Sequence, residues 1–593
     1  MASSTSKLGS LARARRGAMC LLAVLAAISP TAAGVEIHVS PKSGEDSLDR
    51  DGSASHPYRT LTYAIARAEG LGGGARLDVV LAPGAYAEED PARPELGGEV
   101  FPIRLPASYA EISLRGGGSS APAGGEAAVL ASAAGEAAIL EARSGASDSL
   151  RDLEVADLEL CGGAAGLTLE AEAGGFLRAR AERCRFSSQV RAAVEVRAAG
   201  RGEASFALER SNVRSAGGGL VAETGPEAVV GVRVAGCRIE DLRAYGPGAI
   251  LGSAVDVHLD ARARASVRVE RNAFLGVASG VLLTSSEPEP GAPASAGSLC
   301  AQVVGNLIAG RRPGGGGSDA GTLLRAGAYL SLWPHHEIDI LIASNTFAEV
   351  AGPVVYQDNL DALGLAEVAP PEGGAPAAIP FTFVNNICYR VFAPSEFEVE
   401  GRGAPFPPEG VAIFRNILEA SSLGAELADG NLSLDPLFAD PDAGDFRLRP
   451  ESPAVDRADP EYADLTLWDL DGRCRRASAA CRLDAWAYPM DLGAYELPGF
   501  CDRDVRVFRR GDCDGDAEAR VEISDAIFTF AHLFLGGKAP QCPDACDSND
   551  DGGIDLTDGV YTLGYLFLGG PPPLPPFDRP GTDPTRDCLE PSA

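Results

Sequence analysis

The chain has 593 residues and a formal net charge of -32, with 71 glycines, 42 prolines and only 6% aromatic residues. A single compact core rarely grows to this length, so the composition favours short strands and turns arranged as a repeat or as several domains. The acidic balance excludes a protein that binds nucleic acid, because phosphate binding needs a basic surface.

Segment 1–33 has the pattern of an export signal peptide. Basic residues such as Arg15 and Arg16 precede the apolar run Ala18–Ile28, and small residues follow at Thr31–Ala33. An apolar run of about 11 residues is too short for a membrane-spanning helix, which needs about 20. We therefore expect cleavage near Ala33 and a secreted, extracellular or cell-surface protein without a membrane span.

Segment 34–497 contains a four-residue phrase that recurs at intervals of 26 to 41 residues. Its fourth position is apolar, and its second position is Cys184, Ser211, Cys237, Asn272, Asn306, Asn345, Asn386 or Asn416. Strands with period-2 alternation precede the copies, as at Val232 and Val234. Asn at a repeated turn suits a left-handed backbone, and stacked copies would form a hydrogen-bonded ladder. The repeat predicts stacked parallel β coils, since an antiparallel sandwich would show more Asn-Gly hairpin signals.

Both ends of this segment carry further motifs. The first motifs are Val39–Asp46, His56–Ala64, Leu81–Tyr86 and Phe101–Ile103; the last are Asp435–Phe438, Ser452–Asp456 and Asp491–Glu496. They resemble secreted bacterial proteins of the pectate-lyase-like superfamily, and the opening also resembles a conserved domain of unknown function found there. The resemblance implies a mainly β fold, a right-handed parallel β-helix solenoid over 34–497, with polysaccharide as the ligand class.

That superfamily includes polysaccharide lyases and glycoside hydrolases, whose chemistry needs acid and base residues. The alternating run Val255–Glu270 predicts one strand whose even positions face solvent. The catalytic candidates on it are Asp256, His258, Asp260 and Arg268, and the carbohydrate-binding candidates are Arg180, Arg233, Arg264 and Trp333. A competing interpretation is that glutamates of neighbouring coils pair with these arginines across the strands. A polysaccharide-binding protein, a lyase or hydrolase, and an inert surface or adhesive protein therefore remain open.

The cysteines suggest two uses. Export permits disulfides, and Cys474 and Cys481 are close enough to form a local one. The five cysteines of the tail have no pairing that the sequence assigns: Cys501, Cys513, Cys542, Cys546 and Cys588. Cysteines in strand-rich sequence are expected to be buried small apolar residues: Cys161, Cys184, Cys237, Cys300 and Cys388.

Segment 498–593 contains a twelve-residue calcium loop at Asp547–Asp558. Oxygen ligands occupy its positions 1, 3, 5, 9 and 12, with Gly552 at the turn: Asp547, Asn549, Asp551, Asp555 and Asp558. Upstream, Asp525 takes the place of Asp558, and nearly the same apolar helix follows each aspartate, at Ala526–Gly537 and Gly559–Gly570. The tail is thus a tandem of two loop–helix units.

The first loop offers Asp512, Asp514, Asp516, Glu522 and Asp525 as ligands. A register that begins at Asp512 leaves two extra residues, whereas one that begins at Asp514 keeps the spacing but puts Ala519 at the glycine position. The duplicated units resemble type I dockerin repeats, an EF-hand-like α-helical module. This resemblance implies calcium as cofactor and a cohesin-like protein or another cell-surface component as partner.

Overall fold

The chain folds into two compact units, Met1–Leu434 and Asp435–Ala593. The computed structural model describes residues 34–88, 98–117, 127–133, 135–242, 252–286, 297–310, 324–332, 337–357, 379–393, 397–399, 411–419, 430–466, 468–473, 475, 490–497, 508–515, 520–535, 537–538, 540, 542–579 and 581. The predicted signal peptide lies outside these residues. No helix among the described residues is long and apolar enough to cross a membrane.

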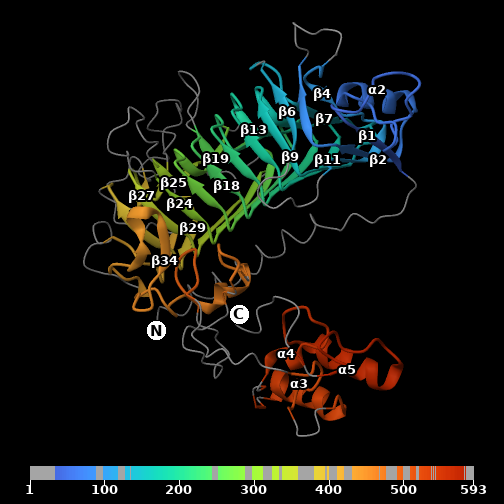
Figure 1. The fold of residues 1–593 in the computed structure, drawn as a ribbon. Helices are drawn as coiled ribbons and strands as arrows, with labels where there is room; N and C mark the ends of the chain where they lie inside the picture. Colours follow the sequence, from blue (N-terminus) through green and yellow to red (C-terminus); the bar gives the residue numbers. More distant parts are fainter. Residues whose placement is uncertain are drawn as a thin grey trace. The chain divides into compact units, whose positions relative to one another are not determined.

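The first unit is a parallel β-helix (Figure 1). Each coil passes in turn through a first, a second and a third sheet, and every strand pairs in parallel with the same strand of the next coil. In the part of the chain described, these sheets have 12, 10 and 10 strands. The predicted parallel β-helix is therefore confirmed, while its right-handed sense stays a prediction.

The first sheet contains β1 (Val35–Val39), β2 (Gly74–Leu81), β5 (Tyr109–Gly116), β8 (Asp152–Ala156), β11 (Phe176–Glu182), β14 (Glu203–Glu209), β17 (Val229–Ala235), β20 (Arg264–Glu270), β23 (Ser298–Val304), β26 (Glu337–Ala343), β29 (Phe381–Val384) and β32 (Val411–Phe414). The second contains β3 (Gly84–Ala87), β6 (Ala128–Ser132), β9 (Leu158–Gly162), β12 (Arg185–Ser187), β15 (Asn212–Arg214), β18 (Arg238–Glu240), β21 (Ala273–Leu275), β24 (Leu307–Ala309), β27 (Thr346–Val350) and β30 (Ile387–Val391). The third contains β4 (Ile103–Arg104), β7 (Leu140–Ser144), β10 (Ala165–Ala171), β13 (Ala192–Ala198), β16 (Leu220–Thr224), β19 (Ser253–Leu259), β22 (Ser279–Ser285), β25 (Ala326–Ser331), β28 (Val355–Gln357) and β31 (Phe397–Val399).

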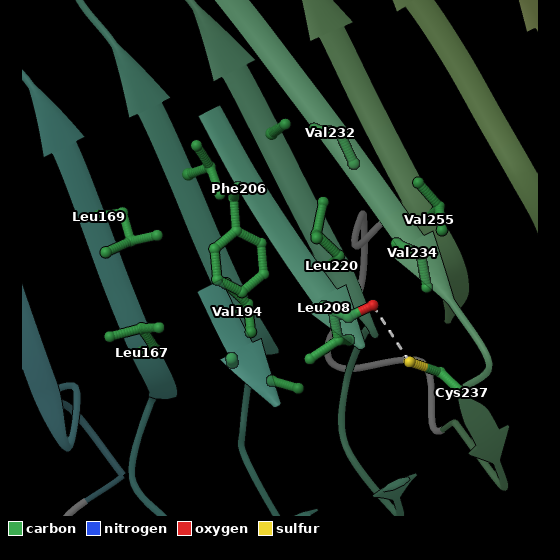
Figure 2. Packing of buried hydrophobic residues seen from close by; sticks show 14 of the residues in the cluster. Leu167, Leu169, Val194, Phe206, Leu208, Leu220, Val232, Val234, Cys237 and Val255 are labelled. Atoms are coloured by element: carbon green, nitrogen blue, oxygen red, sulfur yellow. Dashed lines mark hydrogen bonds between the residues drawn. The ribbon is translucent and has the colours of Figure 1, made fainter. Parts of the chain in front are cut away.

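The core runs along the inside of the coils (Figure 2). Because side chains alternate along a strand, every second residue points inward and meets its counterpart in the next coil. Phe206 of β14, for example, is in register with Val232 of β17, which is in register with Val267 of β20. These rows are buried throughout, so the variable loops leave the apolar stack unbroken.

The predicted ladder is present at the turn between the first and second sheets. The Nδ2 of Asn306 donates to Oδ1 of Asn345 at 2.9 Å, and Asn345 donates to Asn386 at 3.0 Å. The same bond joins Asn272 to Asn306, Asn386 to Asn416, and Asn416 to Asn431. Asn431 is a further rung that the spacing of the repeat does not predict, because it follows Asn416 after only 15 residues.

The expectation that these asparagines adopt the left-handed backbone is wrong. The residue before each one has positive φ, as at Arg271 (53°), Ser344 (55°) and Asn385 (60°). That residue turns the chain from the first sheet into the second, while the buried side chain after it bonds to neighbouring coils. Turn geometry and ladder are thus divided between two adjacent positions.

Helix α2 (Leu61–Gly70) lies at the N-terminal end of the solenoid (Figure 1). Leu61 and Ile65 belong to the same core as the strands, and Tyr109 of β5 donates a hydrogen bond to the carbonyl of Ala68. At the start of α2, the buried Glu99 carboxylate accepts from the backbone amides of Leu61 and Thr62. The helix therefore covers the edge of the stack that has no preceding coil.

The second unit begins with an antiparallel pair, β33 (Phe438–Asp440) and β34 (Asp445–Leu448), joined by the 3-10 turn Pro441–Ala443. A second 3-10 segment spans Pro460–Leu465. The helices that follow are α3 (Ile523–Leu535), α4 (Pro543–Cys546) and α5 (Leu556–Leu568). Helices α3 and α5 correspond to the two helices predicted for the tail. The domain boundary predicted after residue 497 stays a prediction.

A disulfide joins Cys513 to Cys546 in the second unit. In the first unit Cys184, Cys237 and Cys388 are buried as expected, and burial raises the pKa of Cys184 and Cys237 to about 12. Cys161 and Cys300 are only partly buried, so the expectation of full burial is wrong for these two. The proposed Cys474–Cys481 pair lies outside the described residues.

Candidate functional site

The predicted strand Val255–Glu270 is two strands, which changes the arrangement of the catalytic candidates. β19 belongs to the third sheet and β20 to the first, with a turn between them in which the Asp260 side chain accepts from the amide of Arg262 at 3.2 Å. Alternation continued through this turn because Asp260-Ala261-Arg262-Ala263 happens to keep period 2. Asp256 and His258 therefore share one face, while Arg268 belongs to another sheet.

Asp256 is the most perturbed acid of the third sheet. Its carboxylate has no hydrogen-bond partner among the described residues, and burial together with the nearby charge of Glu223 raises its pKa to about 7. Val221 of β16 is in register with Asp256, and Glu223 with His258, so Glu223 is the diagonal neighbour of Asp256. Glu223 is itself paired with Arg197, whose Nε lies 3.2 Å from its Oε2. An acid with a raised pKa beside a second carboxyl group is the kind of arrangement from which acid–base pairs are built.

His258 is held beside Asp256 by two hydroxyl groups of the next coil. Its Nδ1 lies 2.8 Å from Oγ1 of Thr284, and its Nε2 lies 3.0 Å from Oγ of Ser286. Both ring nitrogens are therefore engaged, which fixes the imidazole on the outer face of the sheet. Asp260 lies in the turn beyond, where its amide donates to Oγ1 of Thr224 at 2.8 Å.

Two tyrosines continue the same outer row. Asp256 is in register with Leu282, Leu282 with Tyr329, and Tyr329 with Tyr356. The tyrosine ring centroids are 5.0 Å apart. The buried Leu282 separates Asp256 from Tyr329 in this row, so the acid and the aromatic pair lie two coils apart. Aromatic faces suit a ligand with apolar faces and hydroxyl edges. Sequence reasoning missed Glu223 and both tyrosines, although an aromatic residue at an outward position of an alternating strand was an available signal.

The arginines proposed for acidic sugars are held in a chain of ion pairs on the first sheet. Arg180 contacts Glu182 at 2.9 Å and Glu209 at 2.6 Å, and Arg233 contacts Glu209 and Glu270, each at 2.6 Å. The contacts of Arg180 with Glu209 and of Arg233 with Glu209 and Glu270 cross between strands, as the competing interpretation predicts.

The same row of ion pairs on the first sheet ends at Arg268, which contacts Glu270 at 2.7 Å. Burial alone would raise the pKa of Glu270, but Arg268 and Arg233 hold it below its usual value. Arg264 is exposed at the start of β20, and Trp333 lies outside the described residues.

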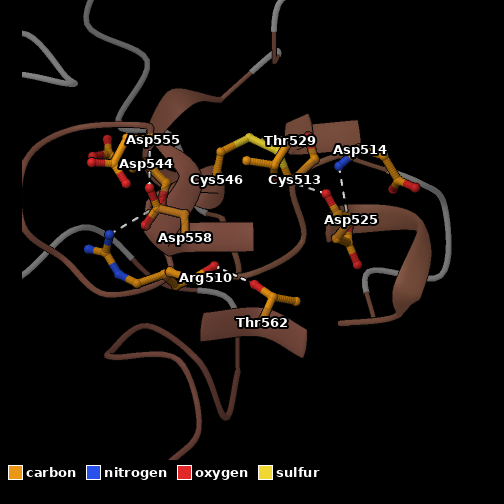
Figure 3. The surroundings of a disulfide bond; sticks show 11 residues. Arg510, Cys513, Asp514, Asp525, Thr529, Asp544, Cys546, Asp555, Asp558 and Thr562 are labelled. Atoms are coloured by element: carbon orange, nitrogen blue, oxygen red, sulfur yellow. Dashed lines mark hydrogen bonds between the residues drawn. A yellow bond between two sulfur atoms is a disulfide. The ribbon is translucent and has the colours of Figure 1, made fainter. Parts of the chain in front are cut away.

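The first acidic loop gathers its carboxylates. One oxygen of each of Asp512, Asp514 and Asp525 lies within 4.8 Å of the others. Asp525 also accepts from the amide of Asp514 at 3.2 Å (Figure 3). It accepts from the amide of Glu522 as well, at 2.7 Å. Burial, together with the charges of Asp514 and Asp512, raises the pKa of Asp525 to about 6.

The second loop has the same internal bonds at equivalent places. Asp558 accepts from the amides of Asn549 at 3.5 Å and Asp555 at 2.8 Å. Asn549 therefore corresponds to Asp514 and Asp555 to Glu522, which makes Asp512 the counterpart of Asp547. Of the two registers considered for the first loop, this geometry matches the one that begins at Asp512. Asp516, its third expected ligand, lies outside the described residues.

The second loop is folded around its first and last aspartates. Asp547 accepts from the amides of Asp551 at 3.2 Å and Gly552 at 2.9 Å, and Gly552 has a φ of 83° at the turn. Burial and the charge of Asp547 raise the pKa of Asp558 to about 7. The side chains of both loops offer carboxylate and amide oxygens as metal ligands. Calcium prefers such hard oxygen ligands, so the residues present fit that ion.

Residues 42–164 match the family described as "Protein of unknown function (DUF1565)". No curated protein matches the chain in sequence. Matching solved structures include a glycoside hydrolase, with 10% identity, a TM-score of 0.33, and coverage of 68% of this chain and 99% of that one.

Two further matches are named as lyases. Pectate lyase Pel9A has 12% identity and a TM-score of 0.28, covering 79% of this chain and 97% of its own. A rhamnogalacturonan lyase has 11% identity and a TM-score of 0.27, covering 64% and 87%. At these scores the matches carry no argument about activity, and the fold assignment rests on the parallel sheets themselves.

Proposed function

We propose that segment 498–593, within the second unit of this protein, is a calcium-binding, dockerin-like module. The observation that carries the proposal is the pair of equivalent acidic loops, each closed around a buried aspartate at the start of a helix, Asp525 and Asp558. Buried carboxylates that repel one another are costly unless a cation or a proton compensates them. Calcium bound between them would supply the compensating positive charge and cross-link each loop to its helix.

Calorimetric titration of the purified, chelator-treated protein tests this proposal. The expected result is two binding sites, with binding at the second loop abolished by Asp547→Ala combined with Asp558→Ala. Asp512→Ala is expected to weaken the first loop. Glu451→Gln, at an exposed carboxylate of the same unit, is the control and should bind like the unaltered protein. Absence of calcium binding to the unaltered protein would refute the proposal.

A second function concerns the first unit, whose third sheet would bind polysaccharide. The specific observation is the row of register positions that contains Asp256, whose diagonal neighbour is Glu223, and the tilted ring pair Tyr329 and Tyr356. In a hydrolase, Asp256 would donate a proton to the leaving glycosidic oxygen and Glu223 would activate water or attack the sugar. In a binding protein, the same groups would hold sugar hydroxyls over the tyrosine rings.

Acidic and neutral polysaccharides distinguish these cases when binding, reducing ends and unsaturated products are all followed. Hydrolysis would release reducing ends that Asp256→Asn abolishes, and a lyase would release unsaturated products. Binding without either product would indicate a polysaccharide-binding protein. Glu203→Gln, at an exposed acid of the first sheet, is the matched control. If no glycan binds, the inert surface or adhesive interpretation would stand.

The two units together would form an extracellular protein that is docked or assembled through its calcium-binding tail. A cohesin-like protein or another component of the cell surface is the proposed partner, and the net charge of -32 argues against nucleic acid. Secretion is tested by isolating the protein from culture medium and sequencing its N-terminus, which should begin near Gly34. Recovery of the protein with residues 1–33 intact would contradict it.

A further inference from the structure

The disulfide of the second unit connects the two acidic loops at their first ligand positions. Figure 3 shows the bridge between Cys513 and Cys546. In the sequence, Cys513 directly follows Asp512 and Cys546 directly precedes Asp547. The backbone reinforces this connection, because the amide of Gly511 donates to the carbonyl of Ala545 at 2.7 Å. A displacement of either aspartate is therefore transmitted through one residue and one covalent bridge to the other.

Arg510 forms a second connection from the approach to the first loop into the second loop. Its side chain is fully buried, and its Nη1 donates to the carbonyl of Asp547 at 2.9 Å and to that of Asp544 at 3.2 Å. Its Nη2 lies 2.8 Å from Oδ1 of Asp550, inside the second loop. The residue two positions before Asp512 thus holds the first turn of the other loop.

The helices that end the loops also touch. Gly559 directly follows Asp558, and a Cβ placed on it would lie 2.3 Å from the ring of Phe530 in α3. Only glycine permits this close approach. The last ligand of the second loop is therefore fixed against the helix that begins at the last ligand of the first.

The internal repeat shows that a single loop does not need the disulfide. Ser548 stands at the position of Cys513, and its hydroxyl lies 2.7 Å from that of Thr562 on α5. In the first loop the equivalent Thr529 of α3 donates to Sγ of Cys513 at 3.3 Å. A hydroxyl fills the same place equally well, so the function of the cystine lies in what it connects.

We propose that the Cys513–Cys546 disulfide, together with Arg510, couples the two loops so that calcium bound at one raises the affinity of the other. This inference rests on the proposed calcium function. Ordering one loop fixes its first aspartate, the bridge fixes the first aspartate of the other, and the second ion then meets a loop that has already lost part of its freedom. Coupling of this kind typically changes affinity by about 5- to 150-fold.

The experiment compares loop affinities in the full chain with and without the bridge. Asp525→Asn disables the first loop, so that calorimetry reports the second loop alone. With the disulfide intact, the calcium affinity of the second loop in this variant should be about 5-fold or more lower than the affinity of the same loop in the unaltered protein. In the Cys513→Ser, Cys546→Ser background, Asp525→Asn should change the affinity of the second loop less than 2-fold. Cys161→Ser, in the first unit, controls for loss of a thiol.

Hydrogen exchange provides a readout that does not require the serine variant to fold. In Asp558→Asn protein with the disulfide intact, only the first loop is expected to bind calcium. Adding calcium should still slow exchange of the Gly552 amide, which donates to Asp547 in the second loop. Two independent affinities and unchanged Gly552 exchange would overturn the coupling and leave the calcium proposal standing, whereas absence of any calcium binding would overturn the proposed function itself.

Discussion

Replacement of one rung of the asparagine ladder should destabilise the solenoid strongly. Asn306 is fully buried, and its Oδ1 accepts both from the backbone amide and from the Nδ2 of Asn272, each at 2.9 Å. Its own Nδ2 donates to the carbonyl of Val269 at 2.9 Å. Asn306→Ala leaves the two donors of Asn272 without that acceptor, and each buried donor without a partner costs about 1–3 kcal/mol. We expect a loss of about 2–6 kcal/mol in the free energy of unfolding.

Chemical unfolding of the full chain, followed by far-ultraviolet circular dichroism, measures this loss. Two controls come from the repeat itself. Asn306→Ser should lose less than Asn306→Ala, because Ser211 fills the equivalent place and accepts from the amide of Cys184 at 3.0 Å. Asn212→Ala, at an exposed asparagine, should change stability by less than about 0.5 kcal/mol. If Asn306→Ala behaved like Asn212→Ala, the account of the ladder as a stabilising network would be refuted.

Two further predictions concern pH. The pKa of Asp256 is raised to about 7, so keeping this carboxyl in the folded first unit costs increasing stability between about pH 4 and pH 7. Asp256→Asn should therefore become more stabilising over that interval and level off above it. Unfolding measured at several pH values tests this. A constant difference would contradict the raised pKa. In the second unit, the pKa values of Asp525 (about 6) and Asp558 (about 7) are also raised, so without calcium this unit should lose stability as pH rises from 4 to 7. With saturating calcium the trend should reverse, because acid then displaces the ion; melting temperatures with chelator and with calcium test both signs.

The repeat predicted the solenoid because one residue type had to recur at one structural position. The buried Asn turn leaves a mark every coil, and inward apolar rows such as Phe206, Val232 and Val267 leave period-2 alternation. Loops of any length can be inserted between these marks without disturbing the stack. The fold was therefore readable although the coils differ in length.

The candidate site on the third sheet could be predicted only in part. Asp256 and His258 were found because they share an alternating strand, but Arg268 was assigned to the same face because alternation alone does not reveal a turn. Glu223 and Tyr329 come from other coils, and their distance from Asp256 depends on the register between coils. Spacing within one coil contains no information on that register.

In the tail, the second loop was recognised from local spacing, whereas the register of the first was ambiguous. Two extra residues in the first loop destroy the regular spacing, although the bonds from Asp514 and Glu522 to Asp525 preserve its geometry. The Cys513–Cys546 pair was equally hidden, because its members belong to different repeats. Interactions between repeats require a three-dimensional arrangement that sequence spacing does not supply.

Calcium titration of the chelator-treated full chain is the measurement that tests the central claim most directly. The account predicts two calcium ions bound per chain, protection of the region after residue 500 from proteolysis when calcium is present, and loss of that protection with chelator while the β-helix stays intact. One remaining site in the Asp547→Ala, Asp558→Ala variant would assign the second ion to the Asp547–Asp558 loop. Absence of bound calcium, or a β-helix that is cleaved first when calcium is removed, would contradict the account.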